Sequence, residues 1–257
     1  MPTEKGLRAD GFVPAKVPQM KPSRLFLPVF TLFLLTVNLI VFGYFGDYVS
    51  RIVRFASMFF FFLIALGPKY FKASALIIFL AFVINDFLLI YFESSFNQNL
   101  VLFIRLCAYL LLARLVKPYL KKVKVEIFQG VIFGVVLILN LILLYNLNDS
   151  INAGGDATFL DELLLYGYGT AIIISVTIAF TFYNRYTEKT SIFFLIAVMA
   201  LVMSDFTYFI GFYLGFREFY YLDRAFNIVA IGVLLHFLYL FKQKIAVGYY
   251  NKTREIF

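Results

Sequence analysis

Long runs of apolar residues alternate along the chain with short clusters of charged residues. Most apolar runs have about 17–25 residues, the length that a helix needs to cross about 30 Å of hydrocarbon. The run from Val131 to Leu144 lacks the apolar–polar alternation of a transmembrane β-strand. Because lipid offers the backbone no hydrogen-bond partners, helices are the expected solution. The pattern predicts an all-α, polytopic integral membrane protein.

Eight membrane-spanning helices are expected within a membrane domain of residues 25–241. They cover residues 25–46, 50–67, 71–92, 98–117, 125–146, 164–183, 190–215 and 219–241. Residues 1–24 are basic and proline-rich and read as a cytoplasmic tail. Residues 242–257 form a second, C-terminal tail on the same side.

The basic residues predict the orientation of the spans. They gather in both tails and after the second, fourth and sixth spans: Lys69, Lys72, Lys117, Lys121, Lys122, Lys124, Arg185 and Lys189 in those loops. The other loops are mostly neutral or acidic. Since positive loops stay in the cytoplasm, both termini are expected there, in the inner membrane if the cell is bacterial. Arg51 and Arg54, at the outer start of the second span, run against this pattern.

The composition agrees with a membrane protein and narrows its chemistry. Hydrophobic residues make up 62% of the chain, against about 45–50% in a soluble domain. The net charge of +8 follows from the topology, so no nucleic-acid partner is expected. A single cysteine, Cys107, and a single histidine, His236, exclude an intrachain disulfide and a metal cluster rich in either residue. No metal and no cofactor are expected.

The two halves of the domain, residues 25–124 and 125–241, resemble each other, which predicts a four-plus-four tandem repeat. With four spans each, the halves have the same orientation, so the third and seventh spans are equivalent, as are the fourth and eighth. The informative matches are polar and equally spaced in both halves: Asn38 and Asp47 with Asn140 and Asp149, and Asp86 and Arg105 with Asp205 and Arg224.

Asp86 and Asp205 are the candidate catalytic residues. Each lies inside an apolar span, where a carboxylate costs several kcal/mol and is rarely kept without a partner or a role. Both are about 15 residues from the cytoplasmic end of their spans, hence at matching depth in the outer half. If the halves face each other, the two carboxylates converge on one polar cavity open to the outer leaflet.

Four further polar residues are candidates for substrate binding. Arg105 and Arg224 lie one to two turns into their spans, near the depth of the aspartate of their own half, and an arginine there suits a phosphate. The alternative is two structural Asp–Arg ion pairs. Asn85 and Ser204 directly precede the aspartates and either orient a water or a carboxyl group or bond to their own helix backbone.

With these residues in place, the chain resembles the YhhN-like lysoplasmalogenase family over about residues 30–241. That family has eight predicted spans, with Gly-Asp in the third and Ser-Asp in the seventh. The counterparts here are Asn85-Asp86 and Ser204-Asp205. Asn85 stands where the family has glycine, and Arg114 stands where the family has a histidine in the fourth span.

The resemblance implies hydrolysis of the vinyl ether bond of a lysolipid, giving a fatty aldehyde and a glycerophospho-base. One aspartate is then the general acid and the other the base, with no metal required. The expected partners are the bilayer and a lipid or lysolipid substrate. Two alternatives stay open: a transporter of lipids or small solutes, and a non-catalytic membrane subunit with structural Asp–Arg pairs.

Overall fold

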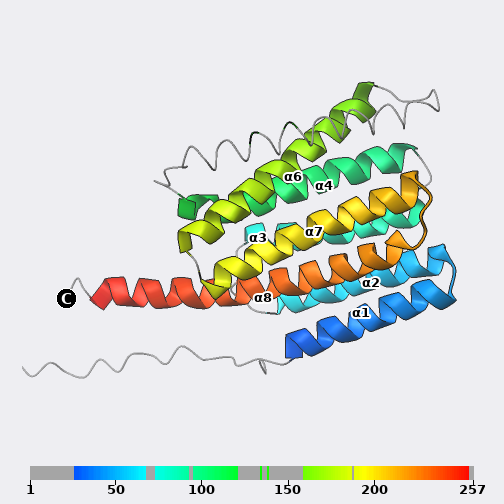
Figure 1. Ribbon diagram of the computed structural model, residues 1–257. Coiled ribbons are helices and arrows are strands. Elements are labelled where there is room, and N and C mark those ends of the chain that lie inside the picture. The colour runs from blue at the N-terminus through cyan, green and yellow to red at the C-terminus, as the bar shows by residue number, and fades with distance from the viewer. Residues whose placement is uncertain are drawn as a thin grey trace, which may run out of the picture.

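The chain folds into a bundle of long helices (Figure 1). The computed structural model describes residues 26–67, 73–92, 95–120, 159–186 and 188–254, with Gly134 and Ile138, and describes side chains as far as residue 241. Its elements are α1 (Phe26–Tyr44), α2 (Asp47–Leu66), α3 (Ala73–Leu88) extended by η1 (Leu89–Tyr91), α4 (Ser95–Val116) extended by η2 (Lys117–Leu120), α6 (Phe159–Tyr186), α7 (Lys189–Tyr213) and α8 (Phe219–Arg254).

In the part of the chain that the structure describes, seven helices are long and apolar enough to cross a membrane. This confirms a multi-pass, all-α membrane protein and seven of the expected spans. The boundaries agree within a few residues, except that α6 begins earlier and α8 continues well past its apolar part, Phe219–Phe241. The expected span 125–146 and the tail 1–24 lie outside the described residues, apart from helical Gly134 and Ile138.

Successive helices run back and forth between two ends of the bundle, except that α4 and α6 run in the same direction. At their starts Asn99 donates a hydrogen bond to Asp161, and at their ends the hydroxyl of Tyr186 donates to the carbonyl of Tyr119 at 2.9 Å. We call the end where α4 and α6 finish and α7 begins the basic end, because Lys117, Arg185 and Lys189 lie there. It is on the left in Figure 1, where α8 projects beyond its neighbours.

The helix α8 is the centre of the packing. It contacts α1, α2 and α7, and its apolar face is buried at nearly every turn: Ile228, Ala230, Ile231, Leu234, Leu235, Phe237 and Leu238. The helix α1 is the opposite case, since only Leu34, Asn38 and Phe42 are buried and its other faces are open. The spacing of four residues places these three on one face. The peripheral α1 therefore depends on a single contact stripe.

A hydrogen bond and one close contact hold α1 against α2 and α8. The side-chain amide of Asn38 donates to Ser57 of α2 at 2.7 Å and to the carbonyl of Leu34 at 2.8 Å. Asn38 thus joins two helices by a hydrogen bond. Gly232 of α8 faces Thr31 of α1, where an added Cβ would lie 2.4 Å from the threonine hydroxyl. Only glycine fits this crossing.

Candidate functional site: a buried charge network

Six charged side chains are buried among the described helices, three arginines and three aspartates. Each residue is at most 7% exposed: Arg54, Asp86, Arg105, Asp205, Asp223 and Arg224. They come from α2, α3, α4, α7 and α8 and lie away from the basic end. Their formal charges cancel, as the high cost of an isolated charge at membrane depth requires. We call these six residues the buried charge network.

Arg54 is the centre of the first part of the network. Its Nε donates to Asp86 at 3.2 Å and its Nη1 to Asp223 at 2.5 Å, so one guanidinium of α2 bridges α3 and α8. Asp223 also accepts from the hydroxyl of Ser204 at 2.6 Å and from Nη1 of Arg224 at 3.2 Å. We call Arg54, Asp86, Asp223 and Arg224 the Arg54 cluster. Its members come from three helices, and Ser204 adds a contact from a fourth, α7.

Two asparagines complete the surroundings of Asp86. The amide of Asn85 donates to its Oδ1 at 3.2 Å. Asn227 of α8 lies between Asp86 and Arg54. With its nitrogen toward Asp86 it donates at 3.5 Å; with the amide turned over, its oxygen accepts from Nε of Arg54 at 3.1 Å. The second orientation gives both amide atoms suitable neighbours. The Oδ1 of Asn85 is buried without a partner.

Asp205 is the centre of the second part. It forms an ion pair with Arg105 of α4 and accepts hydrogen bonds from the hydroxyls of Tyr109 and Tyr168, the first at 2.7 Å. The two tyrosine rings stand edge to face with centroids 6.0 Å apart. Ser175 of α6 donates to the backbone carbonyl of Tyr109 at 2.7 Å and fixes that turn of α4. We call Asp205, Arg105, Tyr109 and Tyr168 the Asp205 cluster.

The geometry of α7 separates the two clusters. Ser204 and Asp205 are consecutive, so their side chains leave the helix about 100° apart. Ser204 faces α8 and the Arg54 cluster, whereas Asp205 faces α4 and α6. The two clusters therefore contact α7 through consecutive residues, Ser204 and Asp205. Asp86 and Asp205 each have their own arginine partner. The structure places the two carboxylates in adjacent clusters instead of opposite each other in one cavity.

The arginine partners differ from those expected. Arg105 was expected beside the aspartate of its own half, Asp86, but it pairs with Asp205. Arg224 was expected beside Asp205, but its contacts are Asp223 at 3.2 Å and the hydroxyl of Ser50 at 3.3 Å. Depth along a helix was a sound guide in both cases. The direction around the helix axis, which packing sets, decided the partner.

Sequence reasoning missed several residues of the network. Arg54 was noted only as an exception to the charge pattern of the loops; it is 1% exposed and belongs to the membrane interior. Asp223 directly precedes Arg224, and Asn227 follows it by one turn, so this face of the eighth span carried a readable polar stripe. Tyr109 and Tyr168 gave no comparable signal, because aromatic residues are frequent throughout the chain.

The structure also shows the contacts of the other polar residues considered in the sequence. Asn85 donates to Asp86, its neighbour in the sequence, whereas Ser204 donates to Asp223 of α8. His236 packs edge to face against Phe193, and Cys107 is half-buried. Within the described ranges, no group of three or more His, Cys, Asp or Glu side chains is arranged to hold a metal ion.

The fold and the network together define a multi-pass α-helical membrane protein with a charge-balanced polar interior. Comparison of the chain with family models, with curated proteins and with solved structures gives no match.

Proposed function

We propose that the chain is an intramembrane hydrolase that cleaves the vinyl ether bond of a lysolipid by acid–base chemistry at Asp86 and Asp205. The observation that carries this proposal is the pair of buried carboxylates in α3 and α7. Each is beside an arginine that can take an anionic group. The proposal extends to the full topology of eight spans in two repeated halves, with both termini in the cytoplasm.

The chemistry needs a proton donor, a proton acceptor and water. A proton adds to the alkene carbon of the vinyl ether, the resulting oxocarbenium ion takes up water, and the hemiacetal breaks into a fatty aldehyde and a glycerophospho-base. A carboxylic acid and a carboxylate supply both transfers. In this scheme Asp86 and Asp205 are the two carboxyl groups, one protonated as the acid and the other ionised as the base.

Substrate binding has to open the network, because Asp86 and Asp205 are at most 2% exposed. Arg224 is the arginine with the longest contacts, at 3.2 Å and 3.3 Å, against 2.5 Å between Arg54 and Asp223. In this proposal the substrate phosphate takes the place of Asp223 on Arg224. Asp223 then keeps its ion pair with Arg54.

A second candidate function is purely structural, and one observation favours it: every carboxylate of the network already has an arginine partner. In that case the network fixes the relative positions of α2, α3, α4, α7 and α8 and has no chemistry. Buried ion pairs serve specificity of packing in some proteins.

The two candidates are separated by measuring turnover and stability together. Purified protein is incubated with a vinyl-ether lysolipid and, as control, its ester analogue, and released aldehyde is measured. We expect aldehyde from the wild type and at least a hundredfold loss in Asp86→Asn and Asp205→Asn, whereas Asp47→Asn, which alters an exposed carboxylate, keeps full activity.

Because an unpaired arginine can itself unfold the bundle, the double variant Arg105→Gln with Asp205→Asn serves as a neutral replacement of the second pair. If the hydrolase proposal is right, this double variant folds but releases no aldehyde. Wild-type protein that releases no aldehyde from either lipid, while the aspartate variants melt at lower temperature, establishes the structural role instead.

A further inference from the structure

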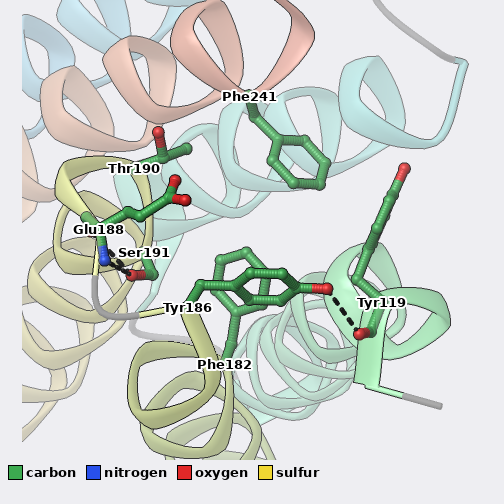
Figure 2. Close-up of a pocket in the computed structure, with 7 residues that line it drawn as sticks. All are labelled: Tyr119, Phe182, Tyr186, Glu188, Thr190, Ser191 and Phe241. Carbon is green, nitrogen blue, oxygen red and sulfur yellow. Dashed lines mark hydrogen bonds between the residues drawn. The ribbon is translucent and has the colours of Figure 1, made fainter. Parts of the chain in front are cut away.

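A second feature of the molecule lies at the basic end, far from the buried charge network. It is a pocket of about 170 Å³ between η2, the end of α6, the start of α7 and Phe241 of α8 (Figure 2). Asp205 is 15 residues beyond Thr190 along α7, hence about 22 Å away. The pocket is therefore separate from the network, and no part of the proposed hydrolysis accounts for it.

Four aromatic rings form most of the wall: Tyr119, Phe182, Tyr186 and Phe241. They are fixed by one another, with centroids 4.8 Å apart for Tyr119 and Phe241 and 5.0 Å apart for Phe182 and Tyr186. The bond from the hydroxyl of Tyr186 to the carbonyl of Tyr119 ties the two sides together at 2.9 Å. The rings are thus a preformed framework, which lowers the entropy cost of binding a ligand.

Glu188 supplies a negative charge at the same pocket. It is the N-cap residue of α7, and its side chain and that of Ser191 form a reciprocal capping box. Figure 2 shows its carboxylate beside Thr190, on the wall opposite Tyr119. A carboxylate next to several aromatic faces is the arrangement that proteins use to bind an ammonium group.

Basic residues stand close in the sequence to the lining residues of this pocket. Lys117, Arg185 and Lys189 are exposed at the basic end, and the guanidinium of Arg185 lies 5.5 Å from the ring centroid of Tyr186. A free cation would be repelled by them, whereas a ligand that carries a cation and an anion side by side is attracted at both points. The phosphate of such a ligand meets the basic residues while its ammonium group enters the rings.

We propose that this pocket binds the head group of a zwitterionic phospholipid, with the ammonium group between the aromatic rings and Glu188 and the phosphate at Arg185 and Lys189. The position agrees with this occupant, because the pocket lies where apolar spans end and where lipid head groups gather. The volume also agrees: one water needs about 10–15 Å³ of such space, so 170 Å³ accepts a group of several heavy atoms.

The test compares lipids that differ only in the ammonium group. Full-length protein in detergent is titrated with a short-chain phosphatidylcholine, or with phosphatidylglycerol of the same chain length, and binding is followed by native mass spectrometry. We expect at least tenfold tighter binding of phosphatidylcholine. Equal affinity, or tighter binding of the anionic lipid, overturns the proposal.

Variants assign that preference to the pocket. Glu188→Gln removes the charge and retains a side-chain oxygen that can accept from the backbone N–H of Ser191. Tyr186→Leu removes a ring, Tyr186→Phe keeps it, and Phe206→Leu removes a ring from the exposed face of α7. The preference should fall about tenfold in Glu188→Gln and Tyr186→Leu and persist in Tyr186→Phe and Phe206→Leu. If the first two variants keep the wild-type preference, the lipid binds elsewhere and the proposal is wrong.

Discussion

Asp223 is the carboxylate on which most of the first cluster converges. It accepts from Arg54, Arg224 and Ser204, so both of its oxygens are occupied although it is fully buried. Arg54 in turn holds two aspartates from different helices. At the scale of single residues, the network is a chain of shared partners in which the loss of one member leaves others buried without a counter-charge. Such a loss costs about 3–5 kcal/mol.

The Arg105–Asp205 pair gives the cleanest test of this energetic argument. Asp205→Leu leaves Arg105 buried and unpaired, so we expect a loss of stability of about 3–5 kcal/mol. The double variant Arg105→Leu with Asp205→Leu removes both charges and should recover most of that loss. Thermal unfolding in a mild detergent measures both effects.

An exposed ion pair provides the control for that measurement. Arg217 and Asp47 are 3.0 Å apart, with side chains 63% and 55% exposed. Arg217→Leu should change stability by less than about 1 kcal/mol, because solvent screens such a pair. A loss in Arg217→Leu as large as in Asp205→Leu would show that burial is not the source of the effect.

At the scale of helices, the apolar runs were enough to place seven spans, because length and hydropathy decide whether a segment crosses a membrane. The contacts between helices could not be obtained in the same way. Arg105 and Asp205 are 100 positions apart in the sequence, and their pairing depends on the rotation of α4 and α7 about their axes. Such rotations follow from packing contacts that the sequence does not reveal. Gly232 is an example, because its close contact with Thr31 is visible only once α1 and α8 are side by side.

The close crossing of α1 and α8 predicts that Gly232→Ala lowers the stability of the protein. Alanine is normally the better helix residue by about 1 kcal/mol. In Gly232→Ala, however, the new Cβ would lie 2.4 Å from Oγ1 and 2.7 Å from Cγ2 of Thr31. We expect a loss of about 1–3 kcal/mol, as for other overpacked contacts. The measurement is thermal unfolding of the purified variant.

Two further variants show whether the contact with Thr31 is responsible. Thr31→Ala removes both close atoms, so it should restore stability when combined with Gly232→Ala. Gly46→Ala adds a methyl group where no atom lies within 4 Å, so it should cost only the change of N-cap residue, about 0.5–1 kcal/mol. Gly232→Ala as stable as the wild type would mean that α1 does not pack this closely on α8.

At the scale of the whole molecule, the two ends of the bundle differ in charge. Exposed Lys117, Arg185 and Lys189 mark the basic end, while the opposite end has four acidic and two basic residues: Asp47, Asp161, Glu162 and Glu218 with Arg51 and Arg217. Arg54 was an exception to this charge pattern in the sequence. In the structure it is buried and neutralised by Asp86 and Asp223, so it does not contribute to the charge of either end. The charge difference between the ends is therefore clearer in the structure than along the sequence, and it predicts that the basic end faces the cytoplasm.

Labelling of single cysteines in intact cells tests that orientation. The chain has only Cys107, so Cys107→Ser gives a background without thiols. On this background, Arg217→Cys and Lys189→Cys place one exposed thiol at each end of α7. A membrane-impermeant maleimide should label Arg217→Cys in intact cells and Lys189→Cys only after permeabilisation. The reverse pattern would place the basic end outside; it would also put the aromatic pocket in the outer leaflet and the buried charge network in the half of the bundle nearer the cytoplasm.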